Sequence, residues 1–94
     1  MNQIPNEKCP LCDAPATFEF RDLKNIRFFH CESCGDFFIS RSAVNWLNKK
    51  EPHRKVRFAQ LSASRNGKKN ILALTIVAGE GLHVEVVPRT KYPE

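Results

Sequence analysis

Four cysteines arranged as two CxxC pairs constrain this chain more than any other feature. The first pair is Cys9 and Cys12, the second is Cys31 and Cys34, and 18 residues separate the pairs. A CxxC turn directs two thiolates toward one point, and two such turns complete a tetrahedral site. The pattern therefore predicts a structural Zn²⁺ held by all four cysteines, which supplies folding free energy that a small core lacks.

Disulfides, iron and redox chemistry are the other common uses of such cysteines. The first residues show no signal-peptide pattern, and cytosolic thiols stay reduced, so disulfides are disfavoured. A redox-active CxxC needs a neighbouring βαβ pattern, which the sequence lacks. Rubredoxin-type iron uses the same four thiolates. Rubredoxins are acidic and space their pairs more widely, which favours zinc, although sequence alone leaves iron open.

Three short strands are predicted around the cysteine pairs. Residues 17–21 alternate between apolar and polar, residues 22–25 form a turn, residues 26–30 return, and residues 36–40 lead out of the second pair. Gly35 follows the second pair, where a tight turn favours a residue that tolerates positive φ. His30, next to Cys31, is either a strand residue, which we favour, or a partner of the metal site.

This order of turns and strands makes residues 9–39 resemble a zinc ribbon, over about a third of the chain. The resemblance implies a structural zinc on the four cysteines and no particular substrate. Residues 31–65 are also loosely similar to the heads of certain bacterial or phage zinc-ribbon proteins, through a CxxCG turn, an Ile-Ser step and a Leu-Ser-containing basic helix. That likeness implies a bacterial or phage origin and little chemistry.

The charge of the chain is concentrated in its middle third. Residues 41–69 carry nine lysines and arginines against Glu51 alone, a net charge of +8, whereas the whole chain has a net charge of +5. Such a segment replaces counterions along a phosphate backbone, or keeps a small protein soluble. The candidate residues for binding nucleic acid or a protein partner are Arg41, Lys49, Lys50, Arg54, Lys55, Arg57, Arg65, Lys68 and Lys69.

Two short helices are predicted in the same segment. Ser40 or Ser42 caps the first, whose inner face includes Ala43 and Leu47. The second runs from about residue 53 to residue 64, with two apolar stripes and serines that we interpret as cap or surface positions. The stripes are Val56, Ala59 and Ala63 on one side and Phe58 and Leu61 on the other.

A β-hairpin is predicted over residues 71–87. Residues 71–77 are apolar on both faces, so this strand is either covered by the helices or paired with a second chain, which would make a homodimer or a protein complex. Residues 82–86 alternate, and Pro88 ends the hairpin before a frayed tail.

The sequence thus predicts an α+β protein with an N-terminal zinc ribbon, two short helices and a C-terminal β-hairpin. Its segments are residues 1–40 for the ribbon, 41–69 for the basic helices and 70–94 for the hairpin and tail, packed as one unit. We expect a cytoplasmic protein without a membrane span, because no apolar run approaches the length that a span needs.

Binding is the predicted function. DNA or RNA is the favoured partner, through residues 41–69, and an adaptor or inhibitor that binds a larger protein is the alternative. An enzyme is not expected, because four thiolates fill the shell of a zinc ion and no nucleophile elbow, phosphate-binding loop or carboxylate pair is present. No small-molecule substrate is expected.

Overall fold

The computed structural model describes residues 6–22, 25–65 and 67–92. Its elements are, in chain order, β1 (Asn6–Lys8), β2 (Pro15–Arg21), β3 (Ile26–Cys31), β4 (Gly35–Ser40), α1 (Arg41–Lys50), a 3₁₀ turn (Pro52–Arg54), α2 (Lys55–Ser64), β5 (Asn70–Val77) and β6 (Gly81–Pro88). The predicted turn at residues 22–25 includes residues 23 and 24, which lie outside the described residues.

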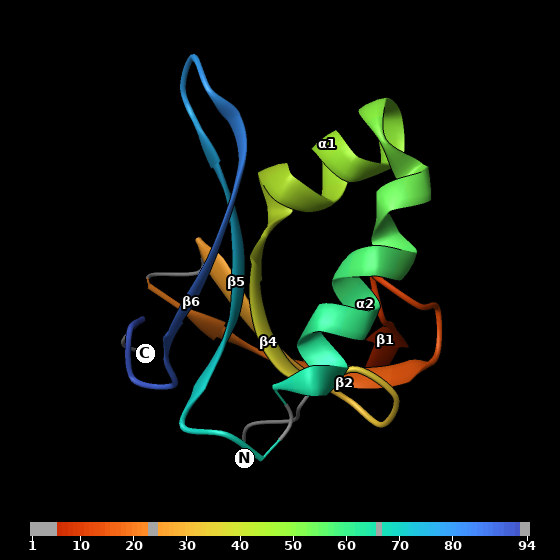
Figure 1. Cartoon of the computed structure of the whole chain (residues 1–94), viewed down its shortest axis with the longest axis vertical. Coiled ribbons are helices and arrows are strands. Elements are labelled where there is room, and N and C mark those ends of the chain that lie inside the picture. Colours follow the sequence, from red (N-terminus) through yellow and green to blue (C-terminus); the bar gives the residue numbers. More distant parts are fainter. Residues whose placement is uncertain (1–5, 23–24, 66, 93–94) are drawn as a thin grey trace.

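All six strands belong to one sheet, in the same order as in the chain. Each neighbouring pair is antiparallel except β4 and β5, which run parallel and pair at Phe38 with Ala73 and at Ile39 with Leu74. A parallel connection needs a crossover, and α1 and α2 form it. Figure 1 shows both helices on the same side of the part of the sheet made by β4, β5 and β6.

The predicted architecture of an N-terminal zinc ribbon, two short helices and a C-terminal β-hairpin is wrong, although the α+β class holds. The parallel pairing of β4 with β5 joins all the strands into a single mixed sheet. The physical reason is that both strands are apolar on both faces, so each is most stable in the middle of a sheet. Phe37, Phe38 and Ile39 in β4 are fully buried, as are Ile71 and Leu74 in β5.

The helix-facing side of the sheet carries the main core. Phe18, Phe29 and Phe37 lie on neighbouring strands, and the rings of Phe29 and Phe37 stack with centroids 5.5 Å apart. Leu47 of α1 and Phe58 of α2 cover them. The cysteines Cys9, Cys31 and Cys34 belong to the same cluster, so the predicted metal site is continuous with the core.

The opposite side of the sheet has a smaller core that the C-terminal segment covers. It contains Phe28, Phe38 and Ile71, and the ring of Tyr92 meets Phe38 edge-on at 4.9 Å. Arg89 forms an ion pair with Asp36, and its Nε donates a hydrogen bond to the Lys68 carbonyl at 3.0 Å. The prediction of a frayed tail is therefore wrong for residues 89–92; residues 93 and 94 lie outside the described residues.

The helices follow their predicted positions but not all of their predicted faces. Ser40 caps α1, since its Oγ accepts the Ala43 N–H at 3.1 Å. In α2 the buried residues are Phe58 and Ser62, four positions apart on one face. Val56, placed in a buried stripe from the sequence, is 63% exposed, and Leu61 is 42% exposed. One buried stripe suffices because α2 packs on the sheet from one side.

Removing the Tyr92 ring should destabilise the second core. We expect Tyr92→Ala to lower the free energy of unfolding by about 2 kcal/mol, since an aromatic contact and part of the cover over Phe38 are lost. Lys91→Ala, at an exposed neighbouring position, is the control and should change stability by less than about 0.5 kcal/mol. Urea unfolding measures both, and equal stability of Tyr92→Ala and the parent chain would show that the tail does not cover this face.

Candidate metal centre

The four predicted ligands meet at one point in the structure. Their Sγ atoms all lie within 4.8 Å of one another, with 3.7 Å between Cys9 and Cys34 and 3.5 Å between Cys12 and Cys31. A tetrahedral zinc with Zn–S bonds of about 2.3 Å separates its sulfurs by about 3.8 Å. The thiols are free rather than joined in disulfides. The arrangement therefore fits a metal ion coordinated by four thiolates.

The two turns that carry the cysteines are built alike. The first joins β1 to β2, where the Asp13 N–H donates to the Cys9 carbonyl at 2.9 Å, and the second joins β3 to β4. The residue after each pair has positive φ, 78° at Gly35 and 63° at Asp13. The prediction for Gly35 is confirmed. Asp13 holds the matching position because aspartate tolerates this conformation better than most residues.

Backbone N–H groups stabilise a thiolate in the second turn. Cys31 Sγ accepts the N–H of Ser33 at 3.4 Å and of Cys34 at 3.3 Å. Burial raises the pKa of Cys31, but these hydrogen bonds outweigh it and the pKa is lowered. The sulfur is thereby prepared as an anionic ligand.

Burial keeps two of the other sulfurs protonated when no metal is bound. Burial raises the pKa of Cys9 to about 12, although the backbone of Leu11 and Cys12 acts against it. Burial and the neighbouring cysteines also raise the pKa of Cys34. A cation that displaces these protons removes the cost of burying thiolates, so metal affinity should rise with pH.

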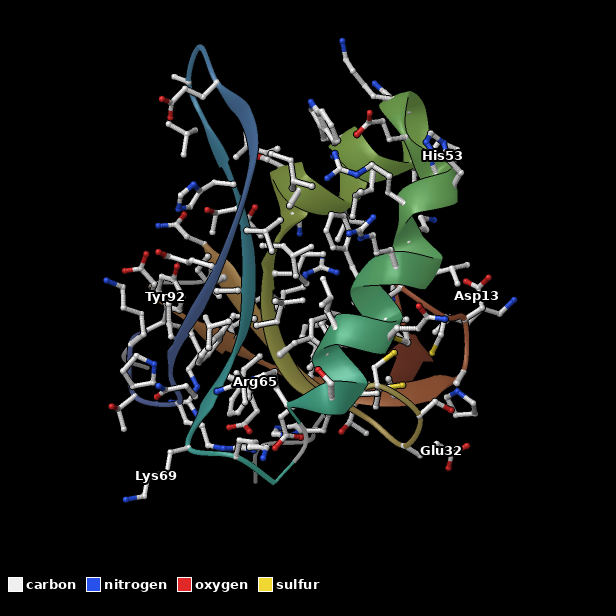
Figure 2. All side chains as sticks on the ribbon, in the orientation of Figure 1. Asp13, Glu32, His53, Arg65, Lys69 and Tyr92 are labelled. Carbon is white, nitrogen blue, oxygen red and sulfur yellow. The ribbon has the colours of Figure 1, made fainter. Side chains whose placement is uncertain are left out.

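A serine of α2 connects the helix to the second cysteine turn. Ser62 is fully buried, and its Oγ donates a hydrogen bond to the Cys34 carbonyl at 2.8 Å. Figure 2 shows the sulfur atoms between α2 and the two loops that carry Asp13 and Glu32. The sequence interpretation of Ser62 as a cap or surface residue is wrong. Its spacing of four residues from Phe58 was the signal that it faces the sheet.

His30 belongs to a polar network on the other side of the sheet. Its Nδ1 lies 2.9 Å from Asp36 Oδ1 and its Nε2 lies 2.9 Å from Glu19 Oε2, so carboxylates engage both ring nitrogens. Burial lowers the pKa of His30, but the hydrogen bonds to Glu19 and Asp36 outweigh it and the pKa is raised. The imidazolium form is the one that donates to both carboxylates.

The structure divides the nine basic residues into separate groups. Five surround the junction of α1 and α2, three follow the end of α2, and Arg41 begins α1. The first group is Lys49, Lys50, Arg54, Lys55 and Arg57, and the second is Arg65, Lys68 and Lys69. Figure 2 shows His53, which lies within the first segment, and Lys69, which belongs to the second group, toward opposite ends of the molecule.

Two of these residues have side-chain partners among the residues that the structure describes. Arg54 forms an ion pair with Glu51 at 2.6 Å and lies over the ring of Phe58, 5.0 Å from its centroid. Arg65 Nε donates to the Asn70 carbonyl at 3.1 Å.

The segment 71–77, for which the sequence predicts either cover by the helices or pairing with a second chain, lies within β5, between β4 and β6.

No protein-family model matches the chain, and neither a curated protein nor a solved structure is significantly similar to it.

Neither α1 nor α2, nor any other helix in the described ranges, has the length and apolar character needed to cross a bilayer.

Loss of the Ser62 hydroxyl should loosen the metal centre. Ser62→Ala leaves the buried Cys34 carbonyl without this donor, so we expect a loss of about 1–3 kcal/mol in stability. Ser64→Ala is the matched control, because Ser64 is exposed on the same helix. Chemical unfolding at saturating zinc measures the stability of both variants. An equally small loss of stability in Ser62→Ala and Ser64→Ala would contradict the role of Ser62 in anchoring the second cysteine turn.

Stability should also depend on the protonation of His30. A raised pKa in the folded state means that its contribution is complete below about pH 6.5, the usual histidine value, and declines as pH rises through the folded value. We therefore expect His30→Gln to lower the melting temperature more at pH 6 than at pH 8. Melting curves of both proteins, with zinc saturating, measure this difference. An equal decrease in melting temperature at pH 6 and at pH 8 would show that the ion pairs of the His30 imidazolium do not stabilise the fold.

Proposed function

We propose that this protein holds a structural zinc ion and uses the fold around it to present a cationic surface to nucleic acid. Zinc is the metal that all-thiolate tetrahedral sites of this spacing favour. Cys9, Cys12, Cys31 and Cys34 would hold it, and a shell of four thiolates leaves no position for a substrate. The proposed role of the metal is therefore structural, and the proposed role of the protein is regulatory binding rather than catalysis.

The observation that carries the nucleic-acid proposal is the group of cations at the junction of α1 and α2. Lys49, Lys50, Arg54, Lys55 and Arg57 fall within nine residues, and each is exposed or half-exposed. Glu51 is the one carboxylate between them and is paired with Arg54. The other four form no ion pair within the described part of the chain, so they are available to phosphate groups.

A protein partner is the second candidate, and the exposed aliphatic residues support it. Val56 and Leu61 on α2 and Val86 on β6 are 63%, 42% and 49% exposed. Exposed apolar side chains mark a protein interface where they form one contiguous patch. Such a partner would be retained at high salt, whereas binding to phosphate weakens steeply as salt rises.

The test is the salt dependence of oligonucleotide binding. We expect the parent protein to bind short DNA or RNA at low salt and to lose most of this affinity by moderate salt. Arg54→Ala combined with Arg57→Ala should weaken binding about tenfold and reduce the salt slope by about 1, because the phosphate contact of Arg57 is removed and Glu51 loses its partner Arg54. Lys68→Ala with Lys69→Ala is the control at the opposite end of α2. Absence of binding at low salt, or unchanged affinity in the Arg54 and Arg57 variant, would contradict the proposal.

A further inference from the structure

A groove lies on the helix-facing side of the sheet, between β6 on one side and α2 with the preceding 3₁₀ turn on the other. Its volume is about 670 Å³, and it is lined by His53, Arg54, Arg57, Phe58, Leu61 and Val84. The two elements face one another across this side of the sheet in Figure 1. We refer to these six residues as the α2–β6 groove.

The floor of the α2–β6 groove is apolar and partly open to solvent. Leu61 is 42% exposed, Phe58 is buried beneath it in the core, and Val84 is half-buried on β6. Val86, two positions further along the same face of β6, is 49% exposed. Apolar surface from two elements therefore continues out of the core into a hollow, which is the usual character of a ligand-binding groove.

The rim of the groove is cationic. His53, Arg54 and Arg57 line it, and none of the described lining residues is a carboxylate. Arg57 and His53 are exposed, and neither forms an ion pair within the described residues. Arg54 lies against the ring of Phe58, which holds its guanidinium at the edge of the floor. A ligand that fits this groove has negative charge beside an apolar surface.

We propose that the α2–β6 groove binds single-stranded nucleic acid, with phosphates on the rim and base faces on the floor. This inference rests on the proposed function and specifies its substrate. A duplex keeps its base faces stacked inside, whereas a single strand presents base faces directly to an apolar floor. Lys49, Lys50 and Lys55 lie close to the rim residues in the sequence and add further positive charge. Several cations within nine residues match the closely spaced charges of a phosphate backbone.

Matched charge insertions on α2 test the inference. Leu61→Glu places a carboxylate in the floor, whereas Val56→Glu places the same charge on an exposed position of the same helix that does not line the groove. Fluorescence anisotropy would follow a labelled twelve-nucleotide DNA single strand, the same sequence as a duplex, and polyglutamate. We expect tighter binding of the single strand than of the duplex. Leu61→Glu should weaken single-strand binding about tenfold, and Val56→Glu by less than about threefold.

A milder variant keeps the test independent of folding. Val84→Thr places a hydroxyl in the floor and should weaken single-strand binding by about two- to threefold. Because a half-buried hydroxyl also costs stability, the melting temperature of the variant is measured as the control for folding. Three results would each overturn the inference while leaving a cationic nucleic-acid surface in place. The first is an equal loss of single-strand affinity in Leu61→Glu and Val56→Glu. The others are binding of the duplex, or of polyglutamate, as tight as binding of the single strand. Failure of the parent protein to bind either nucleic acid would overturn the proposed function itself.

Discussion

The convergence of four cysteine sulfurs at one point is the constraint on which the rest of this structure depends. These side chains come from two turns far apart in the sequence, and three of them lie in the main core, where thiolates are costly without a cation. Burial raises the pKa of Cys9 and Cys34, so without a metal these two sulfurs are protonated thiols in the core. A tetrahedral cation makes the same four groups a fixed cross-link between β1, β2, β3 and β4.

The cross-link also positions the helices and therefore the proposed binding surface. Ser62 bonds the second cysteine turn to α2, and Phe58, one turn earlier, anchors the same helix in the sheet. With this face fixed, α2 and β6 define the groove that contains Arg57 and Leu61. A perturbation of the metal site should thus reach the proposed nucleic-acid site through a short chain of contacts.

Local features were predictable from the sequence, whereas the long-range pairing was not. Two CxxC pairs identify the four cysteines, alternation and apolar runs locate β2 to β6, and Ser40 or Ser42 marks the start of α1, where the structure selects Ser40. The short strand β1 was not predicted. The parallel contact between Phe38 and Ala73 joins strands separated by two helices, and no local pattern encodes that register. Ser62 and the tail from Arg89 to Tyr92 were misjudged for a related reason. Polar residues and a chain end are usually exposed, and here tertiary partners bury them.

Metal content combined with stability is the measurement that addresses this account most directly. Native mass spectrometry of the purified protein should find one zinc ion per chain, and removal of the ion with a chelator should lower the melting temperature by at least about 10 °C, since the site contributes several kcal/mol to folding. Protein that carries no metal and unfolds at the same temperature with or without added zinc would contradict the central claim, as would four cysteines found in disulfide bonds.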